Sequence, residues 1–244
     1  MAFNDGDFVL INYTIKVKDG NNLKVQETTY QDVAKQAGIF DPNKKYGPYL
    51  VVIGKSQLIE AVDDAIKEMQ VGEKKEIIAK PEKAYGVKRE DLVIRLPVKQ
   101  LRRYNIPPKI GQKVEIGGRI GIIERLAERF AYIDFNHPLA GKDLSIDLEV
   151  VQKIDDFNDK VKYLVERWLG LDKNKVSIEG DQDSLKINLP SDVIGISDLE
   201  SKLQLLTRDI YQYIKPKEVN INIKVEYKEE SKVENKEETK EKGQ

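Results

Sequence analysis

The chain has 244 residues, of which 40% are hydrophobic and 34% are charged, and its formal net charge is −1. This composition is typical of a soluble globular protein, and the balanced charge gives no reason to expect nucleic acid as the main partner. Cysteine is absent, which excludes disulfides, a thiolate nucleophile and a cysteine-ligated zinc site. No stretch is apolar and long enough to span a membrane, and the first residues lack the pattern of a signal peptide, so we expect a cytoplasmic protein.

The first predicted elements are two consecutive strands joined by a turn. Residues 7–18 alternate side chains in the manner of a strand, and Asp19-Gly20 is a turn signal. A second strand is predicted over residues 23–28. Residues 29–48 then form a loop with a short helical piece at residues 33–37.

The clearest pattern in the chain follows this loop. An apolar run from Tyr49 to Ile53 stops at Gly54, which is typical of a buried strand that ends in a turn. Ser56 can then cap a helix that is over by Gly72. One face of this helix is predicted from apolar side chains at spacings of three and four: Leu58, Ile59, Val62, Ala65, Ile66 and Met69.

A strand over residues 74–80 and the turn Ala84-Tyr85-Gly86 come before a segment of unusual length. Residues 87–134 contain a helix-like piece at residues 98–104 and then three short runs of β character, at residues 113–116, 119–127 and 129–134. A loop of this length without structure of its own is uncommon inside a compact fold, so we predict a small β-rich domain. A strong strand at residues 145–153 follows it.

The remainder of the chain reads as a separate unit. Helical periodicity begins at Phe157 and stops at Gly170, and a hairpin is predicted over residues 176–189. A second helix, capped by Ser197, and a strand at residues 219–227 complete an αββαβ pattern. This unit is small for a stable core of its own, so both dimerisation and docking on the rest of the chain are left open.

The order of these motifs resembles the FKBP family of peptidyl-prolyl isomerases. The resemblance rests on phrases that follow one another at the family's spacing: Phe8–Thr14 with the later Asp19-Gly20, Leu58–Val62, Met69–Gly72 and Ala84–Gly86. The phrase Asn136–Gly141 is similar to the long, SlyD-like branch, which carries a chaperone domain inserted in its flap. The whole layout resembles the longest FKBPs, which are of archaeal type.

The resemblance implies an α+β fold in which an antiparallel half-barrel sheet wraps on a short helix. The implied isomerase domain is discontinuous and comprises residues 1–86 and 135–154. Residues 87–134 are then the insert-in-flap chaperone domain, and residues 155–227 form a C-terminal αββαβ domain that is open to homodimer formation. Residues 228–244 are almost all charged or polar and are predicted to be a disordered tail.

The resemblance also implies the residues of the site. The implied catalytic set comprises Tyr85, Ile59, Tyr13 and Gln26, and the implied substrate-binding set comprises Val25, Tyr49, Leu58, Val62 and Ile146. The hydroxyl of Tyr85 and the backbone N–H of Ile59 would donate hydrogen bonds to the substrate. Gln26 stands where the family has an Asp that accepts from the pocket tyrosine, and Val62 stands where a Trp often forms the floor. The floor is therefore predicted to be shallower and aliphatic.

The function implied by the resemblance is peptidyl-prolyl cis-trans isomerisation in unfolded or nascent chains, without cofactor or metal and without a nucleic-acid or membrane partner. The insert would hold the client through two apolar stretches, Leu92, Val93 and Ile94 and then Ile120, Ile122 and Ile123. His137 is the only histidine, and a structural role is favoured for it over a catalytic one. The alternative is a holdase chaperone with a weak or vestigial isomerase pocket, which Gln26 and Val62 favour.

Overall fold

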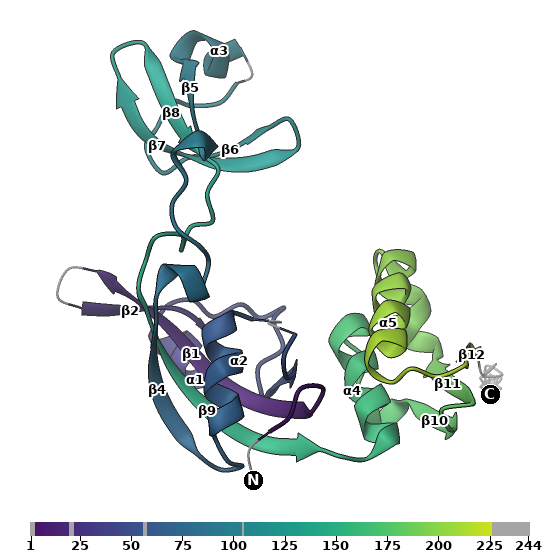
Figure 1. Ribbon diagram of the computed structural model, residues 1–244. Coiled ribbons are helices and arrows are strands. Elements are labelled where there is room, and N and C mark those ends of the chain that lie inside the picture. Colours follow the sequence, from purple (N-terminus) through teal and green to yellow (C-terminus); the bar gives the residue numbers. More distant parts are fainter. Residues whose placement is uncertain (1–2, 20–21, 56–57, 104, 226–244) are drawn as a thin grey trace, which may run out of the picture. The chain divides into compact units, whose positions relative to one another are not determined.

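The computed structural model describes residues 3–19, 22–55, 58–103 and 105–225 (Figure 1). The chain divides into two compact units, residues 1–155 and 156–244. The elements form three β-sheets with a few short helices. The predicted α+β class is confirmed.

The first sheet has five antiparallel strands. They are β1 (Phe8–Asp19), β2 (Asn22–Thr28), β3 (Tyr49–Val52), β4 (Lys74–Ala79) and β9 (Leu144–Ile154). Their order is β2-β1-β9-β4, and β3 also pairs with β1. Strand β9 lies between β1 and β4 although a long segment separates it from β4 in the sequence, so the sheet is complete only after that segment has been spanned.

One face of this sheet is covered by the helix α2 (Glu60–Glu68), which crosses it in Figure 1. The helix buries Val62, Ala65 and Ile66 against alternate side chains of β1 and β9, because successive strand residues point to opposite faces. It is shorter than predicted. Ile59 is its N-cap residue, with an extended backbone at φ −141°, and Leu58 precedes it. The predicted cap, Ser56, lies outside the described residues. A second helix, α1 (Gln31–Gln36), lies in the loop after β2.

The long segment after β4 forms a second sheet with its own core. Its strands are β5 (Val93–Pro97), β6 (Lys113–Ile116), β7 (Arg119–Ala127) and β8 (Phe130–Asp134), in the order β5-β8-β7-β6. The 3₁₀ turns η1 (Pro81–Lys83) and η2 (Glu90–Leu92) lead into it, and the helix α3 (Val98–Arg103) follows β5. The buried core comprises Leu101, Val114, Ile123, Ala131 and Ile133. The strand β5 was not predicted from the sequence.

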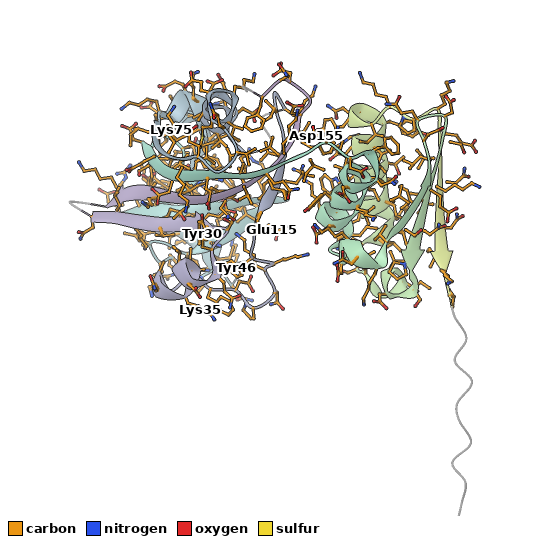
Figure 2. The ribbon with its side chains drawn as sticks, turned by 90° about the horizontal axis from the view of Figure 1, so that it is seen from below. Tyr30, Lys35, Tyr46, Lys75, Glu115 and Asp155 are labelled. Atoms are coloured by element: carbon orange, nitrogen blue, oxygen red, sulfur yellow. The ribbon has the colours of Figure 1, made fainter. Side chains whose placement is uncertain are left out.

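The second unit has the predicted αββαβ order. Its elements are α4 (Phe157–Leu169), η3 (Lys173–Lys175), β10 (Ser177–Gly180), β11 (Ser184–Pro190), η4 (Ser191–Gly195), α5 (Leu199–Tyr213) and β12 (Glu218–Lys224). Strands β11 and β12 are parallel, and both helices lie on one side of the sheet (Figure 2). The indole N–H of Trp168 donates to the buried carboxylate of Asp209, at 2.8 Å, and so joins α4 to α5.

The start of α5 differs from the prediction. Its N-cap residue is Asp198, with a left-handed backbone and no side-chain cap, rather than Ser197. Residues 191–195 form a separate 3₁₀ turn before it. In the described part of the chain, no helix is both long and apolar enough to cross a membrane.

Candidate functional site

The candidate site begins with a tyrosine whose hydroxyl is held by a neighbouring strand. Tyr13 on β1 is 3% exposed, and its hydroxyl donates to the Glu27 carboxylate at 2.9 Å. The ammonium of Lys44 lies 3.1 Å from the same carboxylate oxygen. Burial, together with the Glu27 charge and hydrogen bond, raises the pKa of Tyr13 above its ordinary value. Tyr13 is therefore a neutral hydrogen-bond donor at physiological pH.

The prediction that Gln26 accepts a hydrogen bond from the Tyr13 hydroxyl is wrong, because Glu27 accepts it. A β-bulge shifts the register of β2, so that Glu27 pairs with Ile15 while Val25 pairs with Lys16, and Gln26 is the extra residue between them. The Gln26 side chain is exposed to solvent. The sequence does not reveal the bulge. It does show an acidic residue, Glu27, directly after the position where the family has its Asp, and this could have pointed to the acceptor.

Two further tyrosines lie near Tyr13. The ring of Tyr49 meets the Tyr13 ring edge to face, with the centroids 6.1 Å apart and an interplanar angle of 87°. Tyr85 packs against the same hydrophobic core as Tyr49 and is half-buried. Burial, and to a smaller extent the Glu27 charge, raises the pKa of Tyr85, so its hydroxyl also stays protonated.

The apolar base of the site is fully buried. Ile59, Val62 and Ile146 are 3%, 1% and 0% exposed and belong to one core cluster. Leu58 is half-buried and packs on that cluster, as Tyr49 and Tyr85 do. The structure thus brings together most of the predicted site residues, from β1, β3, the start of α2, the turn after β4, and β9. Val25 is half-buried beyond the bulge and is not part of this cluster.

The start of α2 leaves one backbone donor available. The carbonyl of Ile59 accepts from the N–H of Val62 at 3.1 Å. Among the described residues, the Ile59 N–H has no acceptor, as expected of a group at a helix N-terminus. The Ile59 side chain is buried.

His137 lies against Tyr85 rather than apart from the site. The two rings are stacked, with their centroids 4.0 Å apart and an interplanar angle of 7°. The Nδ1 atom of His137 accepts from the backbone N–H of Leu139 at 3.2 Å, which places the ring proton on Nε2. Partial burial lowers the pKa of His137, so the imidazole is neutral at physiological pH.

The two linkers to the second sheet are hydrogen-bonded to each other. The amide of Gly141 donates to the carbonyl of Gly86 at 2.8 Å. The Asn136 side chain accepts from the N–H of Arg89 and donates to its carbonyl, each at 2.9 Å. Lys88 pairs with Glu124 and with a carboxylate at the end of β8. The chain therefore leaves and re-enters the first sheet at neighbouring points.

The predicted client-binding residues are divided between the two faces of the second sheet. Ile123 is 0% exposed, so a client contact through it is wrong, whereas Ile94 is half-buried and packs on the core. The reason is strand alternation, which sends neighbouring residues to opposite faces. Ile120 is 68% exposed, and Ile122 is half-buried. Leu92 and Val93 are also half-buried.

A small hollow lies elsewhere on this sheet, beside α3. It has a volume of about 240 Å³. Its lining is mainly apolar and includes one amide and one carboxylate side chain: Leu96, Gln100, Leu101, Ile106, Glu115, Ile116 and Gly117. None of the predicted client-binding residues lines it. Across the described residues, no group of three or more His, Asp or Glu side chains is placed to hold a metal ion.

Two known families match the chain. Residues 2–109 match the family described as FKBP-type peptidyl-prolyl cis-trans isomerase, and residues 157–234 match the family described as FKBP26 C-terminal. The short-type peptidyl-prolyl cis-trans isomerase of Methanocaldococcus jannaschii is 34% identical over 145 residues, which cover 59% of this chain and 90% of that protein. The chain belongs to the FKBP-type peptidyl-prolyl cis-trans isomerases.

Relatives in bacteria support the same assignment for this FKBP-type isomerase. SlyD of Helicobacter pylori is 29% identical over 116 residues, 46% of this chain and 63% of that protein. The FKBP-type 16 kDa isomerase of Escherichia coli is 27% identical over 149 residues, 59% of this chain and 89% of that protein. The predicted family, the SlyD-like resemblance and the predicted enzyme class are confirmed, and the extra C-terminal region has a family match of its own.

Proposed function

We propose that the chain isomerises X-Pro bonds by binding the prolyl ring between the half-buried side chains of Tyr49, Leu58 and Tyr85, which pack on a buried aliphatic base. The observation that carries this proposal is the convergence of Tyr49, Leu58 and Tyr85 on one buried aliphatic base. A proline ring is apolar and carries no N–H, so an apolar surface edged by a few hydroxyl groups suits it.

The chemistry needs an environment rather than a nucleophile. The barrier to rotation about the peptide bond is about 18–20 kcal/mol, because amide resonance is lost as the bond twists. The planar amide is more polar than the twisted one. Apolar walls that exclude water therefore favour the twisted form over the ground state, and this difference lowers the barrier.

Two donors are suited to hold the substrate while the bond turns. The Tyr85 hydroxyl stays protonated because burial raises its pKa, and the Ile59 N–H has no acceptor in the described part of the chain. Tyr13, fixed by Glu27, lies beside Tyr49 and keeps that wall in place. We assign Tyr85 and Ile59 to substrate binding in the transition state, and Tyr13 to positioning.

The test is the variant Tyr85→Phe, which keeps the ring and its stack on His137 but removes the hydroxyl. A hydrogen bond made in the transition state is worth about 1–1.5 kcal/mol, so kcat/KM for a proline-containing tetrapeptide should fall about tenfold. The matched control is Tyr211→Phe, an exposed tyrosine on α5. Equal activity of the two variants would exclude the donor role.

The proposed function includes folding assistance, in which residues 87–134 hold an unfolded client near the isomerase site. Tethering raises the local concentration of prolyl bonds without a new contact at the site. Deleting residues 87–134 and joining the neighbouring linkers should leave tetrapeptide isomerisation largely intact but slow the catalysed refolding of a protein. An equal loss with both substrates would contradict this division between the two sheets.

The holdase alternative has less support than the sequence suggested. One of its two arguments was Gln26 as a poor acceptor for Tyr13, and Glu27 accepts that bond instead. The other, an aliphatic floor at the buried Val62, still applies. A wild-type chain that does not accelerate tetrapeptide isomerisation above the uncatalysed rate would favour the holdase.

A further inference from the structure

The segment between the two linkers has a charge unlike that of the whole chain. Residues 87–134 contain eleven lysines and arginines against six aspartates and glutamates, whereas the complete chain has a net charge of −1. A positive excess on a small domain attracts anionic partners over several ångströms. The position of these charges on the second sheet then decides which partner fits.

Two arginines lie on the outer face of this sheet, opposite the core. On β8, Ala131 and Ile133 are buried, so Tyr132 between them faces the other way. Arg95 on β5 and Arg125 on β7 are both in register with Tyr132, one from each side. The three side chains therefore form a row across the neighbouring strands β5, β8 and β7.

Both guanidinium groups are stacked on aromatic rings. The Cζ atom of Arg95 lies 3.5 Å from the ring centroid of Phe130, and that of Arg125 lies 3.7 Å from the ring centroid of Tyr132. Stacking restrains a long side chain and leaves the N–H groups at the guanidinium edge available for bidentate hydrogen bonds. Arg95 and Arg125 are exposed, and within the described residues neither has an ion-pair partner.

Two carboxylates on the neighbouring strands share one lysine. Glu124, next to Arg125 on β7, and Asp134 at the end of β8 both pair with Lys88, at 2.6 and 2.9 Å. These carboxylates pair with the Lys88 ammonium and not with the two stacked guanidinium groups, which stay available to a partner from outside. Carboxylates match their fork geometry well.

Apolar side chains share this face. Val93 is opposite Asp134 in the register of β5 and β8, and Ile122 is opposite it in that of β7 and β8. Ile120 lies two residues before Ile122 and is largely exposed. A partner that combines carboxylates with apolar side chains fits this mixture. Bases of single-stranded RNA stack on open aromatic rings, but the rings of Phe130 and Tyr132 are each covered by a guanidinium.

We propose that the outer face of the second sheet, defined by Val93, Arg95, Ile120, Ile122, Arg125 and Tyr132, selects unfolded client segments in which acidic and apolar residues are interspersed. This inference rests on the proposed client-holding role of residues 87–134 and names the class of client. Neutral apolar segments bind less tightly, and segments rich in lysine are repelled.

The experiment measures fluorescence anisotropy of labelled, proline-free peptides on the full chain. Three peptides share one apolar framework and carry glutamate, glutamine or lysine at the same intervening positions, and a single-stranded RNA is the fourth probe. The glutamate peptide should bind about tenfold more tightly than the glutamine peptide, and this advantage should shrink as salt is raised. The lysine peptide should bind least.

The decisive variant is the double replacement Arg95→Gln with Arg125→Gln, which should reduce the affinity for the glutamate peptide to that for the glutamine peptide. The matched control, Arg102→Gln with Arg103→Gln, removes the same charge from α3 and should leave most of the preference intact. Replacing Arg95 and Arg125 by lysine keeps the charge but loses the planar stack and the fork, so an intermediate preference is expected.

The outcomes separate this inference from the role on which it rests. If no peptide binds, the proposed client-holding role fails. If the glutamate and glutamine peptides bind equally, the client-holding role stands and the acidic preference is overturned. Tighter binding of the RNA than of the glutamate peptide, lost in the Arg95 and Arg125 double variant, would assign this face to nucleic acid instead. If the Arg102 and Arg103 control also lost the preference for the glutamate peptide, the preference would depend on net charge alone. The assignment of binding to the outer face would then be wrong.

Discussion

The first and second sheets are both antiparallel, and each has a short helix packed on its buried face. They differ in whether their polar side chains find partners within the protein. In the first sheet the hydroxyls of Tyr13 and Tyr30 donate to Glu27 and Glu149, and Ser145 donates to Glu76. In the second sheet Arg95 and Arg125 rest on aromatic rings, and no carboxylate pairs with them in the described part of the chain.

This contrast fits two different tasks. A site that turns a neutral amide gains from donors whose orientation is fixed beforehand, because no reorganisation is then needed during the reaction. A surface that holds varied clients gains from charges that have no internal partner. On the proposed function, the same sheet architecture supports a preorganised site in one case and a receptive surface in the other.

The largest expected effect comes from placing a charge in the core of the second sheet. Ile123→Asp buries an unpaired carboxylate at a position that is 0% exposed, so this sheet should lose more than about 3 kcal/mol of stability. Hydrogen exchange should report unfolding of β5–β8 with protection retained in β1 and β9. Peptide isomerisation should persist, and catalysed refolding of a protein should be lost.

The matched control for this prediction lies three residues away on the same strand. Ile120 is 68% exposed, so Ile120→Asp should change stability by about 0.5 kcal/mol or less. If Ile123→Asp also removed protection from β1 and β9, the two sheets would unfold together and the proposed separation of tasks would have no structural basis.

A smaller effect is expected at the bulge of β2. Glu27→Ala leaves the buried hydroxyl of Tyr13 without its acceptor, which should cost about 1–3 kcal/mol, whereas Gln26→Ala should cost about 0.5 kcal/mol or less. Loss of the Glu27 charge and hydrogen bond should also lower the pKa of Tyr13, although burial keeps it above its ordinary value. Denaturant unfolding and ultraviolet titration of the phenol measure the two effects. If the two variants lost equal free energy of unfolding, Gln26 would again be a candidate acceptor for the Tyr13 hydroxyl.

The smallest effect is pH-dependent and concerns the stack of His137 on Tyr85. Since burial lowers the pKa of His137 in the folded chain, the unfolded chain binds the proton more readily. The stabilising contribution is therefore complete above the ordinary histidine pKa of about 6.5 and is lost as the pH falls through the lowered value.

Protonation would also remove the Nδ1 acceptor used by the Leu139 N–H, so kcat/KM should fall on the acid side together with stability. The variant His137→Phe keeps a ring against Tyr85 but does not titrate, and its activity and melting temperature should vary less between pH 5 and 7. An unchanged pH profile in that variant would assign the dependence to another group.

Most strands and helices were predictable from local periodicity, whereas their arrangement as a half-barrel was implied only by the family resemblance. The alternation in β1 and β9 and the helical spacing in α2 and α4 identify a buried face without knowledge of their neighbours. The strand β5 was missed because its apolar start was assigned to client binding. The start of α5 was misplaced because Ser197 has the right side chain for a cap, whereas Asp198, which takes that place, does so through a left-handed backbone.

The candidate site was predictable only where a family motif names the residue. Tyr13, Tyr49 and Tyr85 lie together as the resemblance implied, but Glu27 depends on a bulge that only the pairing of β1 with β2 defines. The stack of His137 on Tyr85 and the row of Arg95, Tyr132 and Arg125 join residues that are distant in sequence. Such contacts follow from strand register and from the packing of distant loops, neither of which a single sequence contains.

The hydrogen bond from the Gly141 amide to the Gly86 carbonyl marks a place where the segment between these residues could be replaced by another domain. Because the outgoing and returning chains already touch there, a foreign domain with adjacent termini needs no change in the length or register of β4 and β9. Evolution or protein engineering could therefore replace the part that we propose to hold clients while the first sheet is kept, and so direct the same isomerase to a new set of substrates.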